Sequence, residues 1–264
     1  MLNILAITRR ELNGYFTTPV AYVMMCGLTF LGSYFFVNFV QQFIQASLLA
    51  QQMPQYLDPG KLNLTDAVMA PLLFNLAVIL VFVMPFVSMR LLAEERRQGT
   101  LELLMTAPIN STELVLGKYL GGLVLVTLTL ALTLLYPAVL TYFGGSTGGS
   151  PLEWSTVACG YLGLFCWAAA SLAIGLFVSA LTDSQVVSAI ITFALLLLTW
   201  IISWVADRAE AGVLKDVLAN LSSSQHLIAF VKGELALKDL VYFGSLMVLG
   251  LFLTQRAVES HRWS

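Results

Sequence analysis

Long uncharged apolar stretches dominate this sequence and restrict what it can fold into. Four of them run over residues 67–89, 119–152, 154–182 and 184–206. Each is longer than the about 20 residues that a helix needs to cross a lipid bilayer. Two further stretches without charge, at 12–57 and 240–255, lie toward the ends of the chain. Helices satisfy their backbone hydrogen bonds internally, so runs of this kind predict membrane-spanning helices.

The sequence therefore predicts an all-α membrane protein with six transmembrane helices. The composition agrees, because only 11% of the 264 residues are charged, against about 25% in soluble domains. The predicted spans cover residues 18–40, 70–91, 117–142, 154–181, 185–206 and 237–256. No segment between them is long enough to fold alone, so we expect residues 1–264 to form a single membrane domain.

The distribution of basic residues predicts the orientation of the chain. An even number of spans places both termini on one side of the membrane. With these spans, eight of the 13 lysines and arginines fall on that side and five on the other. Because basic residues are enriched in cytoplasmic loops, we expect both the N-terminus and the C-terminus to be cytoplasmic.

The segments outside the spans carry patterns of their own. Residues 2–16 mix apolar side chains with charge, which predicts an amphipathic helix in the membrane interface that ends near Gly14. The alternative is that these residues simply begin the first span. On the opposite side, residues 41–66 predict short surface helices, and residues 207–237 predict a re-entrant or interfacial helical hairpin. Within the third span, Pro137 is expected to kink the helix.

Charged residues gather between the second and third spans, in segment 90–118. Lipid cannot solvate such a cluster, so we expect it to lie in water or against another protein. Gly99 has the backbone freedom to end a cytoplasmic extension of the second span. Asn110 and Glu113 are spaced as a capping box for the helix that follows.

Between Gly99 and Asn110, Thr100 can cap a short amphipathic helix. This helix would present Leu101, Leu104 and Met105 beside charged residues. Such a helix can dock in a groove of a soluble partner, with apolar side chains providing affinity and charges providing register. The alternative is an ordinary solvated loop whose leucines dip into the membrane interface.

Motifs for catalysis or cofactor binding are not found. The sequence has no GxxxxGK[ST] phosphate-binding loop and no HExxH motif. Neither His226 nor His261 has a catalytic partner at a motif spacing, and the three cysteines show neither metal-site nor disulfide spacing. We therefore expect this chain not to be an enzyme and to hold no cofactor or metal. No basic tract indicates nucleic acid binding.

The charged segment resembles that of ABC-2-type ABC transporter permeases. The matching residues are ERRQGTLELL at 95–104, TAP at 106–108 and LGKY at 116–119. The opening RRELNGYFTTPVAYV is also similar to the gliding-motility-type branch of these permeases. The resemblance implies that the loop over 92–116 holds a coupling helix that docks on a separate ATPase.

By this resemblance, residue roles and partners can be assigned as expectations. The coupling residues are Glu95, Arg96, Gly99, Thr100, Leu101, Glu102 and Leu104, and the turn at Asp183 and Ser184 is a second, smaller ATPase contact. The expected partners are two copies of an ABC ATPase, which bind ATP and Mg, and a second permease chain, identical or homologous. An external accessory subunit is compatible with the pattern. The resemblance implies an exporter in the bacterial cytoplasmic (inner) membrane.

Two other classes of function compete with this interpretation. A membrane scaffold would dock a cytoplasmic partner through loop 92–116 without transporting anything. An intramembrane enzyme would need a catalytic constellation, which the sequence does not show. Scarce charge along the spans favours a lipid-like substrate over an ion.

Overall fold

The structure is a computed structural model of the chain, and it describes residues 2–52, 63–100, 110–144, 152–208 and 212–260. The described residues are 90% helical and contain no strand. The helices are α1 (Leu2–Thr17), α2 (Pro19–Gln52), α3 (Ala70–Ser88), α4 (Ala93–Arg97), α6 (Ser111–Thr133), α7 (Leu135–Gly144), α8 (Trp154–Leu181), α9 (Gln185–Arg208), α10 (Val213–Leu221), α11 (Ser223–Val231) and α12 (Leu237–Ser260). A π-helical turn, Thr65–Met69, precedes α3.

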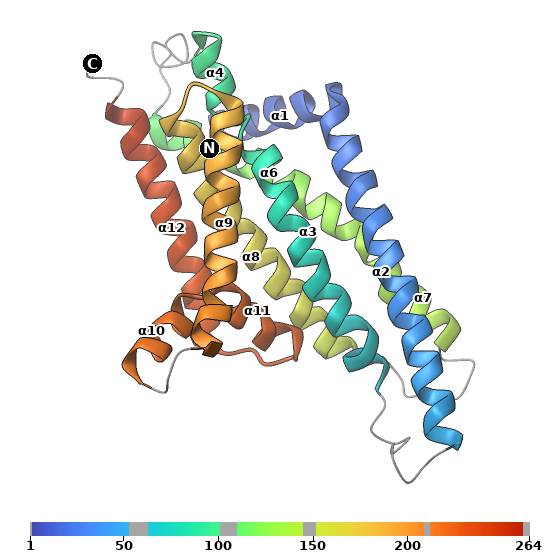
Figure 1. Cartoon of the computed structure of the whole chain (residues 1–264). Helices are drawn as coiled ribbons and strands as arrows, with labels where there is room; N and C mark the ends of the chain where they lie inside the picture. The colour runs from blue at the N-terminus through green and yellow to red at the C-terminus, as the bar shows by residue number, and fades with distance from the viewer. Residues whose placement is uncertain (1, 53–62, 101–109, 145–151, 209–211, 261–264) are drawn as a thin grey trace.

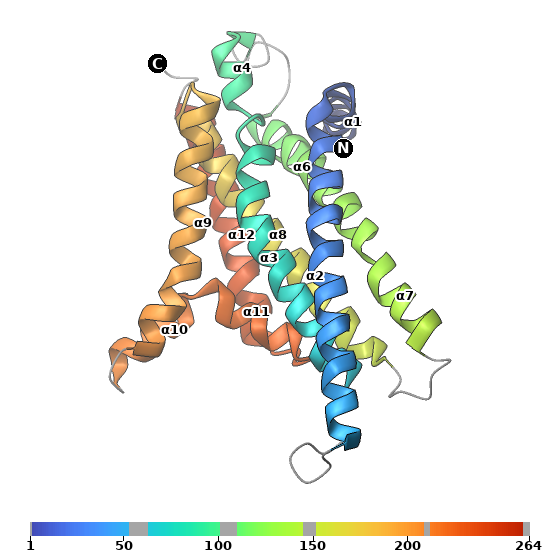
Figure 2. The ribbon, with the colours of Figure 1, turned by 45° about the vertical axis from the view of Figure 1, so that its right-hand side comes forward.

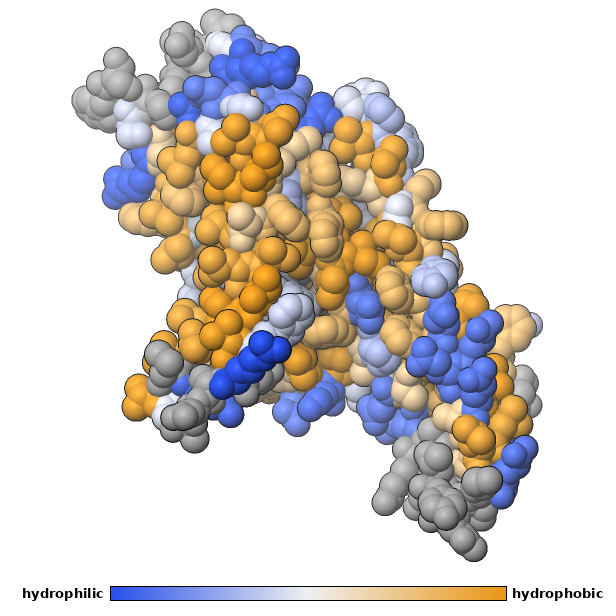
Figure 3. Space-filling model, in the orientation of Figure 1, coloured by the Kyte–Doolittle hydropathy of each residue, from blue (hydrophilic) through white to orange (hydrophobic). Residues whose placement is uncertain are grey.

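Six helical segments of the described residues are long and apolar enough to cross a membrane, as predicted. They are Pro19–Gln52, Thr65–Arg97, Ser111–Phe143, Trp154–Leu181, Gln185–Ala206 and Leu237–Ser260. Their apolar side chains form a band around the middle of the visible face, with hydrophilic residues gathered toward the two ends (Figure 3). The chain is therefore a multi-pass membrane protein.

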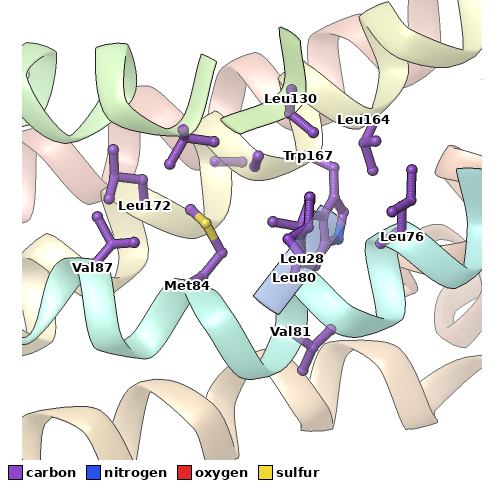
Figure 4. Close-up of a cluster of buried hydrophobic side chains, with 14 of the residues drawn as sticks. Leu28, Leu76, Leu80, Val81, Met84, Val87, Leu130, Leu164, Trp167 and Leu172 are labelled. Atoms are coloured by element: carbon purple, nitrogen blue, oxygen red, sulfur yellow. The ribbon is translucent and has the colours of Figure 1, made fainter. Parts of the chain in front are cut away.

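Helix α8 lies at the centre of the bundle and is the most buried of the six spans. Its Trp167 and Leu172 pack against Leu80 and Met84 of α3, and Leu28 of α2 reaches the same cluster (Figure 4). Lipid is as apolar as these side chains, so association of the spans rests on close packing rather than on the hydrophobic effect. This core fixes the relative positions of the spans on which the polar ends are built.

The two ends of the bundle carry different elements (Figures 1 and 2). Both termini, α1 and α4 lie at one end, which is called the α4 end below. The α10–α11 hairpin lies at the other end, where it connects α9 to α12. This arrangement confirms the prediction of a helical hairpin between the last two spans.

Helix boundaries differ from the predictions at the end of α1 and at the end of the first span. Helix α1 continues past Gly14 to Thr17, since one glycine costs a helix only about 1 kcal/mol. Helix α2 continues beyond residue 40 to Gln52, so the predicted short surface helices over 41–52 are wrong. Glutamines are good helix formers, so a helix can extend beyond the lipid into water. Residues 53–62 lie outside the described part of the chain.

The third span is interrupted where the sequence places a proline. Helix α6 ends at Thr133 and α7 begins at Leu135. Pro137 has no N–H to donate to the carbonyl of Thr133, four residues earlier. The Tyr161 hydroxyl of α8 donates to that carbonyl instead, at 2.8 Å. The predicted break is therefore present and is stabilised from a neighbouring span.

Candidate functional site

The charged segment after the second span lies at the α4 end of the bundle (Figures 1 and 2). Of its predicted coupling residues, Glu95, Arg96, Gly99 and Thr100 are described, whereas Leu101, Glu102 and Leu104 lie outside the described residues. The predicted amphipathic helix over 101–105 therefore stays a prediction.

Helix α4 is a separate short helix rather than a direct extension of the second span. Helix α3 ends at Ser88, and a turn leads into α4 at Ala93. Gly99 then has φ +67°, in the left-handed region that glycine adopts without strain. The Thr100 hydroxyl donates to the Glu95 carbonyl at 3.3 Å. This turn redirects the chain immediately before the predicted coupling helix.

Lys118 is the centre of a buried charge network that joins three elements. Its Nζ lies 3.2 Å from Glu11 Oε2 of α1 and 3.0 Å from Glu95 Oε1 of α4. The lysine side chain is only 2% exposed, and that of Glu95 is 12% exposed. The expectation that the whole cluster lies in water or against another protein is therefore wrong for Lys118 and Glu95, because they are buried in contact with each other inside the chain.

The carboxylates of this network are not fully compensated. Burial raises the pKa of the Glu11 carboxyl above its usual range, although Lys118 acts in the opposite direction. Protonation of Glu11 therefore favours the folded state, and this contribution is lost as the pH rises through its folded pKa. Glu95 Oε2 is buried without a hydrogen-bond partner among the described residues. The network faces a cavity of about 180 Å³ that is also lined by Arg10, Glu94 and Gln98.

Arg96 joins α4 to the turn between α8 and α9. Its Nε lies 2.8 Å from Asp183 Oδ1, and its Nη1 donates to the Ala180 carbonyl at 2.5 Å. The two segments that the sequence predicted as ATPase contacts are thus in direct contact with each other. Asp183 is 75% exposed, so its carboxylate is accessible to a partner, and Ser184 beside it is also exposed.

Ser179 holds α4 against α8, and sequence reasoning missed it. Its Oγ accepts hydrogen bonds from the backbone N–H groups of Leu92 and Ala93, at 3.1 and 2.9 Å. It also lies 3.2 Å from the Met89 carbonyl and is fully buried. A lone serine inside an apolar span carries no sequence motif, so only the fold reveals that it caps the start of α4.

Ser179→Ala should lower the free energy of unfolding by about 1–3 kcal/mol, because two buried N–H groups lose their acceptor. Thermal unfolding of the purified protein in lipid nanodiscs measures this. Ser245→Ala is the matched control, since Ser245 is exposed and bonds only to a carbonyl of its own helix. Equal unfolding temperatures for the two variants would contradict the role given to Ser179.

Helix α1 is fastened along the start of α6. Asn110 and Glu113 form the predicted capping box of α6. The amide of Asn3 donates to Glu113 Oε2 at 3.1 Å, and the Thr8 hydroxyl donates to the Gly117 carbonyl at 3.1 Å. Asn3 and Thr8 therefore hold α1 against α6, beside the contact between Glu11 and Lys118.

A second feature lies within the apolar band, between α3, α9 and α11. A cavity of about 600 Å³ there is lined mostly by apolar and aromatic side chains, among them Phe74, Phe82, Trp200 and Trp204. Polar groups such as Ser203 and Gln225 line it as well. A cavity of this composition suits an apolar chain with a small polar group.

Metal-binding clusters of three or more His, Cys, Asp or Glu side chains are absent from the described residues. Cys26, Cys159 and Cys166 are free thiols. His226, however, has a partner that its sequence spacing did not indicate. It contacts Asp239, 13 residues later, at the end of the bundle opposite α4.

The sequence was also compared with known proteins. A family model described as ABC-2 family transporter protein matches residues 16–231. No curated protein matches the chain. The family match covers α2 through α11. Of the three elements that meet at Lys118, it includes all of α4 and α6 but only the end of α1.

Proposed function

The chain belongs to the ABC-2 family of transporter proteins, and we propose that it is the membrane-spanning subunit of an exporter powered by a separate ATPase. ABC-2 permeases normally partner with an ABC ATPase. The observation that carries the proposal is the contact between Arg96 of α4 and Asp183 of the α8–α9 turn, at 2.8 Å. This contact unites the two candidate docking segments into one surface.

The proposed ATPase-docking surface consists of the predicted helix at 101–105, the exposed residues Arg97 and Gln98 of the α4 turn, and the turn at Asp183 and Ser184. Its exposed charges provide register for a partner, and Leu101 and Leu104 provide apolar anchors. We assign this end to the cytoplasm of a bacterial cell, with both termini beside it. The enrichment of basic residues around it supports that orientation.

Motion passes from the surface to the spans through internal contacts. Glu102 and its neighbours move with the ATPase when it closes on ATP. Gly99 connects them to α4, from which Glu95 acts on Lys118 and Arg96 acts on the α8–α9 turn. Because packed helices shift as rigid bodies, the displacement reaches the far end of α8 and α6.

The transport path is proposed to involve the apolar cavity between α3 and α9. Its aromatic lining supports a substrate with an apolar chain. A second permease chain, identical or homologous, would complete the path, and two ATPase subunits would bind ATP and Mg. This chain itself is assigned no cofactor and no catalytic step. The α10–α11 hairpin at the opposite end is available to an external accessory subunit.

Affinity co-purification from native membranes tests the proposal. The wild-type chain is expected to retain an ATP-hydrolysing subunit, and Glu102→Lys is expected to lose it or to uncouple its hydrolysis. The control is Glu234→Lys, which reverses an exposed charge in the loop between α11 and α12, at the opposite end of the bundle. A well-folded wild-type chain that retains no ATPase would instead favour the scaffold interpretation.

A further inference from the structure

His226 and Asp239 form a buried hydrogen-bonded pair that the transport mechanism does not use. His226 Nδ1 lies 2.5 Å from Asp239 Oδ1, and the two side chains are 8% and 1% exposed. His226 belongs to α11 and Asp239 to the first turn of α12. The pair therefore connects the α10–α11 hairpin to the last span.

Both ring nitrogens of His226 face acceptors. Nδ1 faces the Asp239 carboxylate, and Nε2 lies 3.0 Å from the backbone carbonyl of Asn220 in the last turn of α10. A neutral imidazole carries one N–H and one lone pair, so it can satisfy only one of these two acceptors. The imidazolium ion donates to both. With the Asp239 carboxyl ionised, the geometry therefore fits a protonated histidine.

The surroundings favour the same charge state. The Tyr242 ring stacks on the imidazole with centroids 4.0 Å apart, which places a cation over an aromatic face. Nε2 points at the C-terminal end of α10, and Asp239 lies at the N-terminal end of α12, where helix dipoles favour a cation and an anion respectively. The other charged groups lining the adjoining cavity are Asp216 of α10 and Lys238 of α12.

We propose that His226 is a protonation switch, whose imidazolium form fastens the α10–α11 hairpin to α12 and whose deprotonation releases it. The hairpin is fastened at low pH and loosens as the pH rises. Tyr242 adds a constant link, because its hydroxyl donates to the Leu221 carbonyl at 2.8 Å whatever the state of the histidine. In the orientation proposed above, the switch responds to the pH outside the cell.

Nitrogen-15 NMR of histidine in the nanodisc-embedded chain tests the charge state directly. The sequence contains two histidines, so in the His261→Gln variant all histidine ring signals come from His226. At about pH 5, the lower limit of the range in which histidines usually change charge, two protonated ring nitrogens are expected. At about pH 8 one nitrogen is expected to have lost its proton. A neutral ring at the lower pH would overturn the proposal.

Hydrogen exchange of peptides over 212–233 tests the release. After correction for the intrinsic effect of pH, the hairpin of the wild-type chain should exchange more slowly at about pH 5 than at about pH 8. Asp239→Asn should abolish this difference, because the amide no longer favours the imidazolium. An equal pH dependence of exchange in the wild-type chain and in Asp239→Asn would overturn the switch. If Asp239→Asn does not fold, the NMR result on His226 decides.

Discussion

Replacing Lys118 by methionine should destabilise the protein by about 3–5 kcal/mol, the usual cost of removing one partner of a buried charge network. The methionine fills a similar volume, so the loss comes from the charge. Glu11 and Glu95 would then face each other without their shared cation. Thermal unfolding in nanodiscs, together with the yield of monodisperse protein, measures the effect.

An exposed lysine provides the control for this prediction. Lys232 lies at the end of α11 and is exposed, so Lys232→Met should change stability by less than about 0.5 kcal/mol. Glu11→Gln combined with Glu95→Gln should recover much of the stability lost in Lys118→Met, since no buried charge is then uncompensated. If the triple variant is as unstable as Lys118→Met alone, the destabilisation does not come from the charge network.

Replacing Gly175 by valine should separate α8 from α3 and lower stability by about 3 kcal/mol, the upper part of the range for overpacked cores. A Cβ atom at Gly175 would lie 2.4 Å from Ser88 Cβ and 2.2 Å from Ser88 Oγ. It would also approach Thr192 Cγ2 of α9 at 3.1 Å. The three spans meet at this point without space for one more methyl group, so the change should be visible as a lower unfolding temperature.

The matched control is Gly244→Val in α12, where a new Cβ meets no atom within 4 Å. This variant has the same change of residue in the same kind of helix. Its unfolding temperature should stay close to that of the wild-type protein. Equal losses in both variants would show that glycine acts through backbone flexibility, not through close helix packing.

The spans were predictable because their signal is contained in consecutive residues. The fourth span was predicted at 154–181, and α8 covers Trp154–Leu181. The end of α2 was missed because the polar residues over 41–52 were interpreted as leaving the helix, although glutamines are good helix formers. Hydropathy indicates where lipid ends, and it does not indicate where a helix ends.

The candidate site was predictable only in part, for a different reason. The run over 95–104 identified one segment and the turn at Asp183 another, but the sequence could not show that Arg96 joins them. Lys118 was grouped with the charges expected in water. Its burial depends on Glu11, 107 residues earlier, and contacts at that separation leave no local pattern.

The proposed mechanism requires that ATP hydrolysis in a partner move the segment after α4 relative to the bundle. The most direct measurement is the distance between spin labels at two exposed positions, Gln98 beside Gly99 and Val186 in α9. The three native cysteines are first replaced, and the chain is reconstituted with its ATPase. A pair at Val186 and Leu198, both exposed on α9, is the control and should keep its distance. Trapping the ATPase with ATP and vanadate is expected to shift the distance between Gln98 and Val186. An unchanged distance while the bound ATPase hydrolyses ATP would contradict it.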